Sequence, residues 1–223
     1  MTDGIVNHEE HPYNGQEEIP EGTQVLVVGT APPPRFSRKE ERWEGDVDFY
    51  YGSTNNQLWS QIFPKIYGEE ILGVSREQSL KACKKFLCTK KIWMVDVLQT
   101  YWRKNEKSAE DRHLVPLSFT KFEPLFGRLS ELDTVIFTGG RAELWSGAAF
   151  EKENLISPGG FKKLEGGHRM PRYRRLAMNI GCGVRAVNAF TLPSPSRASD
   201  RRYKHSKVGW YEEVLIRKRC PTR

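Results

Sequence analysis

One carboxylate stands in an otherwise apolar run of the 223-residue sequence. Asp96 is the only charged residue in residues 92–98, which read IWMVDVL, a pattern that predicts a buried strand. Because a buried carboxylate without a partner is costly, Asp96 must either face a crevice at the end of this strand or be satisfied by backbone amides as a structural group. The sequence supports both interpretations equally.

Basic side chains gather in the last third of the chain. The whole sequence has 35 Lys and Arg against 28 Asp and Glu, a net charge of +7, but residues 160–223 alone hold 16 basic residues and four acids. Aromatic residues and glycines interleave with the charges in residues 159–175, which favours contact with a nucleic-acid backbone over an ordinary solvated surface. The candidate DNA-binding residues of this segment are Lys162, Lys163, Arg172, Arg174 and Arg175.

These side chains need a scaffold, and the run VLVV at residues 25–28 predicts its central strand. The run has no polar alternation, as in a strand that is buried on both faces of a parallel α/β sheet. Gly29 and the prolines at 32–34 follow it; they cannot continue a ladder or open a helix, so they predict a stiff loop. Open α/β sheets bind ligands at the carboxyl ends of their strands, so we expect the site there.

The remaining elements alternate between strands and amphipathic helices. This alternation predicts an α/β fold, a three-layer α/β/α sandwich around a central four-stranded, mostly parallel sheet. In the first helix, Ser53, Thr54 or Asn55 would act as the cap and Pro64 would bend or shorten the last turn. The expected strands are residues 25–28, 92–98, 134–138 and 184–190, and the expected helices are 56–66, 76–87, 122–126, 142–150 and 206–217.

The length fits one domain with a substantial core. Residues 1–22 are acidic, polar and aperiodic, so we expect a flexible arm without chemistry, followed by a single domain at 23–223. Residues 151–183 interrupt the order of elements and are expected to be a basic, Gly-rich insertion.

The cysteines indicate a reducing compartment. Cys83, Cys88, Cys182 and Cys220 lack the paired spacing of a zinc site and the density of a secreted scaffold. Free thiols are therefore favoured over an iron–sulfur cluster, and no apolar run is long enough to span a membrane. We expect a soluble, cytoplasmic monomer that holds no metal.

Three segments, taken together, resemble the uracil-DNA glycosylase superfamily, most closely its hypoxanthine-DNA glycosylase and mismatch-specific branches. GTAPPP at residues 29–34 is similar to the family's G-x-x-P loop, YYGSTNNQLW at 50–59 to its YY-x-HP-x-N-x-FW segment, and LPSPSRAS at 192–199 to its LPSTSPAN loop. The run at residues 92–98 resembles the family's G-x-x-WDVL segment and places Asp96 at its acidic position. The resemblance extends in order over about residues 24–215, and it implies a glycosylase-like fold.

The chain departs from the family pattern at two places, and the departures shift the implied roles. Ser53–Thr54 replaces the His-Pro pair, and Thr30 or Ala31 replaces an asparagine of the mismatch-specific branch. The resemblance therefore implies that Asn56 is the main catalytic residue, with Asn55 as the alternative assignment.

The resemblance also implies how a flipped base would be held. Asp96 would accept a base N–H or polarise the water, the amides near Thr30 and Ala31 would face a base oxygen, and Tyr50, Tyr51 or Trp59 would stack on the base. For Trp59, helical spacing favours the core. The implied base pocket is Gly29, Thr30, Ala31, Pro32, Tyr50, Tyr51, Gly52 and Trp59. The implied DNA contacts of the late loop are Ser194, Pro195, Ser196, Arg197 and Ser199. For the serines, turn formation is the alternative role, and Arg197 would either fill the hole left in the base stack or bind a phosphate.

The implied function is a monofunctional DNA glycosylase that flips a base out of duplex DNA, hydrolyses its N-glycosidic bond and leaves an abasic site without a cofactor. The substrate is either a deaminated base, uracil or hypoxanthine, in DNA repair, or a bulky modified cytosine such as glucosylated hydroxymethylcytosine in phage DNA, in antiviral defence. Gly52, which could relieve crowding beside Tyr51, and the extra basic segment make the bulky base a candidate beside uracil and hypoxanthine. The alternatives are an inactive DNA-binding module of the same fold and another α/β nucleotide-processing enzyme, although no P-loop or G-x-G-x-x-G motif follows the first strand.

Overall fold

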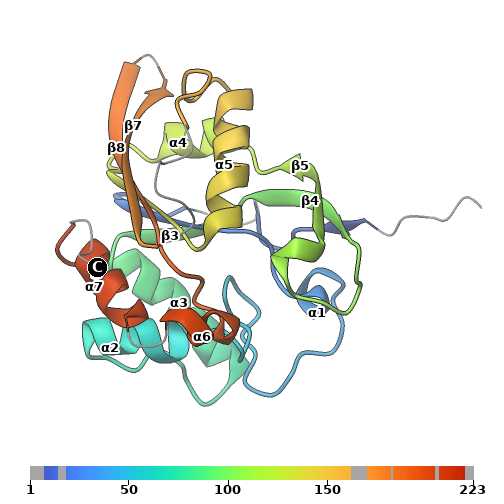
Figure 1. The fold of residues 1–223 in the computed structure, drawn as a ribbon. Helices are drawn as coiled ribbons and strands as arrows, with labels where there is room; N and C mark the ends of the chain where they lie inside the picture. The colour runs from blue at the N-terminus through green and yellow to red at the C-terminus, as the bar shows by residue number, and fades with distance from the viewer. Residues whose placement is uncertain (1–7, 15–18, 162–169, 182, 204–205, 219–223) are drawn as a thin grey trace, which may run out of the picture.

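The computed structural model describes residues 8–14, 19–161, 170–181, 183–203 and 206–218, and its ribbon is drawn in Figure 1. Two sheets organise these residues. The five strands of the larger sheet are β2 (Val25–Gly29), β3 (Ile92–Asp96), β6 (Thr134–Phe137), β7 (Arg172–Ile180) and β8 (Gly183–Thr191).

The larger sheet has the order β3-β2-β6-β8-β7. β3, β2, β6 and β8 are parallel neighbours, so their carboxyl ends meet at one edge, and β7 runs antiparallel to β8. All five residues of β2 are buried. Each apolar side chain buried there contributes about 1.5–3 kcal/mol to folding, which explains why the central strand has no polar alternation.

The larger sheet has one strand more than expected. β7 lies within residues 151–183, which were predicted to be an irregular insertion. Its second half alternates as a strand should, with Leu176, Met178 and Ile180 buried and the residues between them exposed. Three arginines in its first half conceal this alternation in the sequence.

Helices cover both faces of the larger sheet, which gives three layers. Figure 1 shows α2, α3 and α7 below the sheet and α4 and α5 above it. The α-helices are α1 (Pro34–Ser37), α2 (Phe63–Tyr67), α3 (Arg76–Thr89), α4 (Phe122–Arg128), α5 (Gly140–Lys152), α6 (Asp200–Tyr203) and α7 (Lys207–Leu215). One π-helical turn, η1 (Leu58–Ile62), and two 3-10 turns, η2 (Asp111–His113) and η3 (Arg197–Ser199), complete the set. In the part of the chain that the structure describes, no helix is long and apolar enough to cross a membrane.

Two details of the helices correct the sequence-based expectations. Pro34 opens α1, because a proline at the first helical position loses no hydrogen bond. Residues 56–66 do not form one α-helix: the π-helical turn η1 passes directly into α2, and Pro64 lies in the first turn of α2 rather than ending the helix. The left-handed Gly68 caps the C-terminus of α2.

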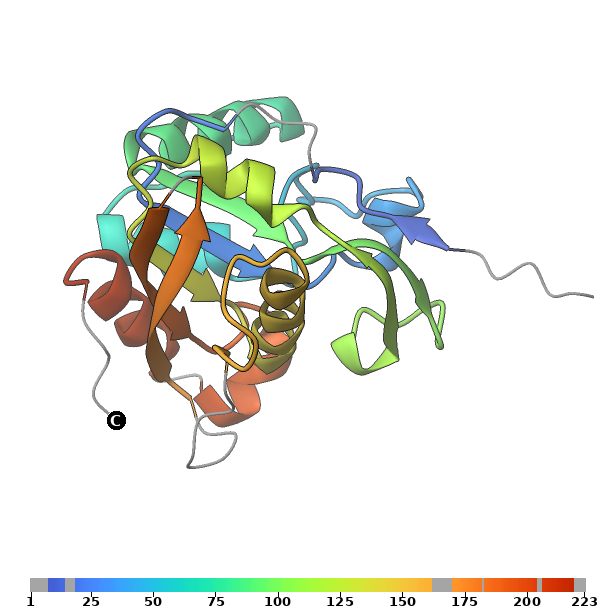
Figure 2. The same cartoon turned by 90° about the horizontal axis from the view of Figure 1, so that it is seen from above.

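A smaller antiparallel sheet lies beside the larger one. It consists of β1 (Glu9–Glu10), β4 (Leu98–Arg103) and β5 (Leu114–Phe119), in the order β1-β4-β5. The run that was expected to be one strand at 92–98 therefore divides at Val97, where the chain leaves β3 and enters β4. Figure 2 shows the β4–β5 hairpin on the opposite side of the molecule from the β7–β8 hairpin.

The expected N-terminal arm is packed over its described part. Glu10 is exposed, but Glu9, His11 and Asn14 are each less than 7% exposed, and β1 pairs with β4. Residues 8–14 therefore belong to the folded body, and this corrects the prediction of flexibility for this part of the arm.

Candidate active site

A cavity of about 530 Å³ lies at the carboxyl ends of β2 and β3. Five segments that are far apart in the sequence form its walls. They are the loop and helix after β2 (30–36), the segment 49–56, the loop after β4 (106–111), Thr138 after β6, and Ser194 and Ser196 after β8. The cavity therefore occupies the edge at which open α/β sheets bind ligands.

The segment that contains Asn56 and the loop after β8 are hydrogen-bonded neighbours. Asn56 forms an isolated antiparallel bridge with Ser196. The Gln57 amide donates to the Pro195 carbonyl at 2.9 Å, and the Arg197 amide donates to the Asn55 carbonyl at 3.1 Å. Two of the three segments that carry the family resemblance thus meet at one wall of the cavity.

Asn56 lines the cavity and is half-buried. Its side-chain oxygen accepts a hydrogen bond from the Leu58 amide at 3.0 Å and so caps η1. Its Nδ2 donates to no other described residue. The side chain is thereby fixed by its oxygen, and its N–H groups remain available to a ligand. Asn55 also lines the cavity but is exposed.

Asp96 lies at the end of β3, lines the cavity and is 7% exposed. Its Oδ2 lies 2.8 Å from Nε2 of His11, which is 1% exposed. Both interpretations of Asp96 are therefore partly right, because the carboxylate faces the crevice and also has a partner. That partner is a side chain rather than a backbone amide. The sequence holds no local signal for His11, since the two residues are 85 positions apart.

Tyr51 and Gly29 enclose the Asp96 carboxylate. The Tyr51 hydroxyl lies 3.0 Å from Oγ1 of Thr138. Burial, and then the negative charge of Asp96, raise the pKa of Tyr51 well above its usual value, so the hydroxyl stays protonated and can donate. Tyr51 has a left-handed backbone (φ 56°), a strained conformation for a side chain of this size and one that occurs at functional sites.

Asp111 supplies a second carboxylate to the cavity, and the sequence analysis did not single it out. Its Oδ1 accepts a hydrogen bond from Oγ1 of Thr30 at 2.7 Å. Burial raises the pKa of Asp111, the Thr30 hydrogen bond opposes this shift, and the charge of Asp96 adds to it. Two carboxylates facing one cavity favour a proton on the group with the raised pKa.

Most of the implied base pocket lines the cavity. The lining members are Thr30, Ala31, Pro32, Tyr51 and Gly52, and Gly29 lies directly against Asp96 and Tyr51. The amides of Thr30 and Ala31 donate to no other described residue. They therefore remain possible donors to a ligand oxygen.

Tyr50 and Trp59 lie in the core instead, which corrects Tyr50 as a stacking candidate. Tyr50 is 3% exposed, and its hydroxyl donates to Oδ1 of Asn14 at 3.0 Å. Trp59 is 2% exposed and donates to the Tyr50 carbonyl at 2.8 Å, as its helical spacing favoured. Of the three candidate rings, Tyr51 is the one that lines the cavity.

Gly52 does not relieve crowding beside Tyr51. A Cβ at this position would lie 1.9 Å from the Val47 carbonyl oxygen. Gly52 is therefore needed for the close approach of two backbone segments, and it provides no support for a bulky base.

The serines of the loop after β8 form the turn itself. Ser196 Oγ accepts from the Ala198 amide at 3.3 Å and caps η3, and Ser199 Oγ donates to the carbonyls of Ser194 and Ser196 at 2.6 and 3.0 Å. Pro195 is buried and Arg197 is exposed. The loop is held rigid by its own side chains, and Arg197 is left free to reach a ligand.

A buried lysine that the sequence analysis missed anchors this loop. Lys207, at the start of α7, is 2% exposed. Its Nζ donates to Oε1 of Gln57 at 2.9 Å, to the Ser196 carbonyl at 3.1 Å and to Oδ1 of Asp200 at 2.7 Å. Three partners satisfy the buried ammonium and join both loops of the cavity wall to α7.

The basic residues near β7 fall into two groups. Arg172 and Arg174 are ion-paired with Glu143 of α5, whereas Arg175 is exposed on the other face of the strand. Lys162 and Lys163 lie outside the described residues. Two of the five arginines and lysines predicted to bind DNA are thus already neutralised within the fold.

Charged and aromatic side chains form the outer rim of the cavity. Arg35 donates to both carboxylate oxygens of the buried Asp46, at 2.7 and 2.9 Å. The Arg35 guanidinium lies 3.8 Å from the centroid of the Trp43 ring, which is 54% exposed. Trp43 is therefore a fixed, accessible aromatic surface at the cavity mouth. The other charged residues of the rim are Arg38, Glu40, Glu41, Glu106 and Lys107.

The arrangement of elements is similar to that of a solved structure. The solution NMR structure of a putative uracil DNA glycosylase from Methanosarcina acetivorans superimposes with a TM-score of 0.57 and 19% identity, over 89% of this chain and 92% of that chain. No protein-family model matches the sequence, and neither does a curated protein sequence. The expected α/β fold class with a mostly parallel sheet is confirmed, with one strand more than expected.

Proposed function

We propose that the protein is a monofunctional DNA glycosylase that binds a flipped base in the cavity and hydrolyses its N-glycosidic bond. One observation carries the proposal. The hydrogen-bonded meeting of residues 55–57 with residues 195–197 forms a wall of a cavity that Asp96 also lines. The similarity of the fold to that of the archaeal protein is consistent with it.

Breaking the N-glycosidic bond produces a positive charge on the sugar and a negative charge on the leaving base, and the enzyme must stabilise both. When the bond from C1′ to the base nitrogen breaks, its electron pair leaves with the base and C1′ becomes cationic. Preorganised N–H donors facing the base stabilise the developing negative charge. The Nδ2 group of Asn56 and the amides of Thr30 and Ala31 are suited to this role.

Asp96 would act on the sugar side of the bond. A water oxygen bonds to C1′, and one of its protons passes to the carboxylate, which later releases it to solvent. The negative charge of Asp96 also stabilises the cationic sugar. The Tyr51 ring is the stacking surface for the flipped base.

The size of the cavity favours a bulky modified base over uracil or hypoxanthine. Cavities of roughly 300–1,000 Å³ accommodate drug-sized ligands, and this one measures about 530 Å³. A small deaminated base would fill only its inner part. An extended substituent, such as the sugar of glucosylated hydroxymethylcytosine, would reach the exposed Trp43 ring at the mouth. Phage defence would then be the biological role, and DNA repair the role if a small base is excised.

The test uses DNA duplexes that contain uracil, hypoxanthine or glucosylated hydroxymethylcytosine. Strand breaks that appear only after alkali reveal abasic sites, and we expect them with the glucosylated base. Asn56→Ala should lower the single-turnover rate about 100- to 1,000-fold, the usual effect of removing one donor to a developing anion, and should leave DNA affinity unchanged.

Asn55→Ala is the matched control, because Asn55 is the exposed neighbour of Asn56. Its rate should stay near that of the wild type, and the reverse result would assign catalysis to Asn55. If the protein binds these duplexes but releases no base from any of them, it is a DNA-binding module and the proposed activity is wrong.

A further inference from the structure

We infer that the N-terminal segment 8–14 is part of the catalytic site and that His11 is a positioning residue for the Asp96 carboxylate. The inference rests on the proposed function, because it concerns the group that accepts a proton from water. It goes beyond that function by assigning a role to a segment that approaches the site from outside the larger sheet.

The hydrogen bonds of His11 determine which ring nitrogen carries the proton. Nδ1 lies 3.1 Å from the backbone amide of Tyr13 and 3.0 Å from that of Asn14, and both amides are donors. Nδ1 must therefore present its lone pair, so the proton of the neutral ring is on Nε2. Nε2–H donates to Asp96 Oδ2 at 2.8 Å.

The ring itself is held in place on its faces and edge. It is 1% exposed, stacks on Tyr50 with 5.6 Å between ring centroids, and meets Tyr13 edge-on at 5.8 Å. A ring packed in this way can present Nε2–H in one direction only. It therefore fixes the rotation of the carboxylate that accepts this hydrogen bond.

Because of this hydrogen bond, the two carboxylate oxygens of Asp96 have different surroundings and different roles. Oδ2 is occupied by His11, whereas Oδ1 lies over Gly29 and beside the Tyr51 hydroxyl. A Cβ added to Gly29 would be 2.1 Å from Oδ1 and 2.5 Å from that hydroxyl. Oδ1 is thus the oxygen directed to the cavity edge, where it can take a proton from water.

Asn14 fixes the backbone of Asp96 in the same way. Its Oδ1 accepts from the Asp96 amide at 3.2 Å, and its Nδ2 donates to the Asp96 carbonyl at 2.8 Å. Residues 11 and 14 together hold the amide, the carbonyl and the carboxylate of one residue. A segment that only covered apolar surface would not need three polar contacts to the same residue.

Glu9 attaches the segment to the first loop of the cavity. The Glu9 carboxylate accepts hydrogen bonds from Arg103 at 3.0 and 3.1 Å and from Arg38 at 2.8 and 3.1 Å. Arg103 also donates to the Pro32 carbonyl at 2.5 Å. The segment therefore connects the proline-rich loop to Asp96.

His11 acts indirectly in this step, because it neither gives nor takes a proton. As the water oxygen bonds to C1′, a water proton moves to Asp96 Oδ1, and the proton on Nε2 stays where it is. His11 exchanges no proton with the substrate. It holds the carboxylate in the correct rotation.

The experiment compares the full-length variants His11→Ala, His11→Gln and His8→Ala in single-turnover kinetics with the best duplex of the assays above. A misplacement of about 1 Å in a reacting group can cost about 100-fold in rate. We expect His11→Ala to lower the rate of the chemical step by up to about 100-fold while the DNA dissociation constant changes less than about twofold. His8, an exposed histidine of the same segment, is the matched control, and its variant should behave as the wild type.

One further readout separates positioning from packing. A glutamine amide can donate to Oδ2, so His11→Gln should recover most of the rate, whereas a side chain that only filled space would not be replaced by this donor. Thermal unfolding of each variant identifies any that fail to fold.

Each outcome decides the inference. A wild-type rate in His11→Ala overturns it, and so does a loss of rate in a folded His11→Ala with no recovery in a folded His11→Gln. If the wild type itself releases no base, the proposed function fails and the positioning role falls with it. If the wild type is active and His11→Ala has the same rate, the proposed function stands and only the positioning role of His11 is overturned.

Discussion

At the scale of one residue, the geometry of the candidate site requires a glycine at position 29, because a larger residue would not fit there. It ends β2 and pairs with Asp96 at the end of β3. The carboxylate and the Tyr51 hydroxyl occupy the space that a Cβ would need. The glycine is therefore required by its contact with the Asp96 and Tyr51 side chains rather than by its backbone conformation.

Gly29→Ala should displace Asp96 and Tyr51 without changing the rest of the strand. Overpacking of this kind costs about 1–3 kcal/mol of unfolding free energy, and a shift of about 1 Å in a reactive group costs up to about 100-fold in rate. Urea unfolding and single-turnover kinetics measure the two effects.

Gly209→Ala is the control for Gly29→Ala, since a Cβ at this exposed position of α7 would touch nothing within 4 Å. Alanine stabilises a helix by about 0.5–1 kcal/mol relative to glycine, so this variant should keep its rate and gain stability. An unchanged rate in Gly29→Ala would show that the orientation of Asp96 does not limit the reaction.

At the scale of elements, an ion-pair cluster joins α5 to β7. Arg172 and Arg174 lie on the face of β7 that also carries the buried Leu176, and Glu143 of α5 lies against this face. Each guanidinium is about a tenth exposed. The cluster replaces apolar contacts at the first half of the strand.

Glu143→Gln should weaken the fold and strengthen DNA binding. Two partly buried guanidinium groups lose their carboxylate, which costs about 1–3 kcal/mol, and one negative charge disappears beside the edge of the sheet that holds the cavity. Denaturant unfolding and the DNA dissociation constant measure the two effects. Glu151→Gln on the same helix is the control, and equal effects of both variants would contradict a special role for the cluster.

The elements also show what sequence patterns can and cannot predict. The strands at 25–28 and 134–138 and the helix at 76–87 were predicted within about two residues, because burial on one or both faces leaves a clear periodicity. β7 was missed because Arg172 and Arg174 occupy inward-facing positions, where they pair with Glu143, and so conceal the apolar alternation. The split of residues 92–98 at Val97 depends on pairing with β5, which no local pattern records.

The sequence predicted the candidate site residues that lie at the ends of the parallel strands or in the loops that follow them. Asn56, Asp96, Thr30 and Tyr51 all line the cavity because the loops after parallel strands meet at one edge. His11 and the link from Lys207 to Gln57 were not predictable, since Asp96 lies 85 positions from His11 and Gln57 lies 150 positions from Lys207 in the sequence. Their contacts exist only in the folded chain.

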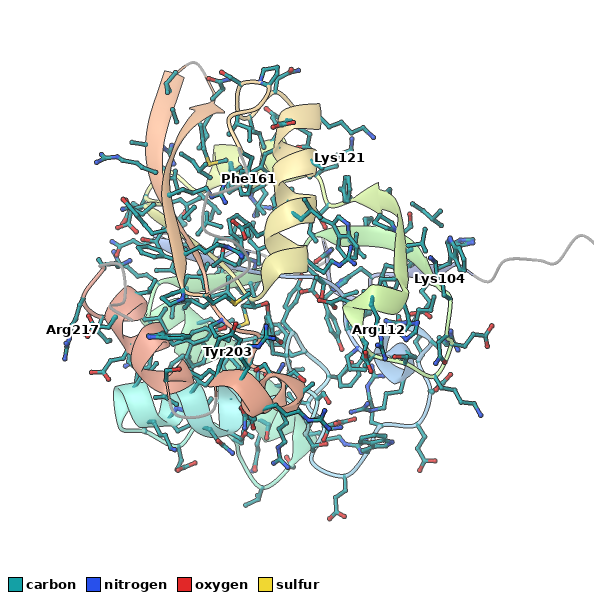
Figure 3. All side chains as sticks on the ribbon, viewed as in Figure 1. Lys104, Arg112, Lys121, Phe161, Tyr203 and Arg217 are labelled. Carbon is teal, nitrogen blue, oxygen red and sulfur yellow. The ribbon has the colours of Figure 1, made fainter. Side chains whose placement is uncertain are left out.

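At the scale of the whole molecule, the charge distribution determines which basic side chains could contact DNA under the proposed function. The chain carries a net charge of +7, but many arginines are committed to internal pairs. Arg197 is exposed at the loop beside Asn56, and its guanidinium has no partner among the described residues. Figure 3 shows Arg112 on the β4–β5 side of the molecule and Arg217 at the opposite side.

Arg197→Ala should weaken DNA binding in a salt-dependent way. A lost phosphate contact reduces the slope of log affinity against log salt by about 1. Binding titrations at several salt concentrations measure it, and the rate of the chemical step at saturating protein should change little. Arg217→Ala is the control, because Arg217 is paired with Glu213 far from the cavity. A changed slope in Arg217→Ala, or an unchanged slope in Arg197→Ala, would place the DNA on another surface.

The position of β7 at the margin of the larger sheet has a consequence for the behaviour of the protein at high concentration. In the described part of the chain no strand pairs with its outer side, so its peptide groups could template the addition of a strand from another molecule. Arg175 is exposed on this strand, and Arg172 and Arg174 face inward as ion pairs with Glu143. Charged residues on an edge strand, including inward-facing ones, are a common protection against such self-association. The same residues that obscure the strand in the sequence thus help to keep separate molecules from joining into fibrils.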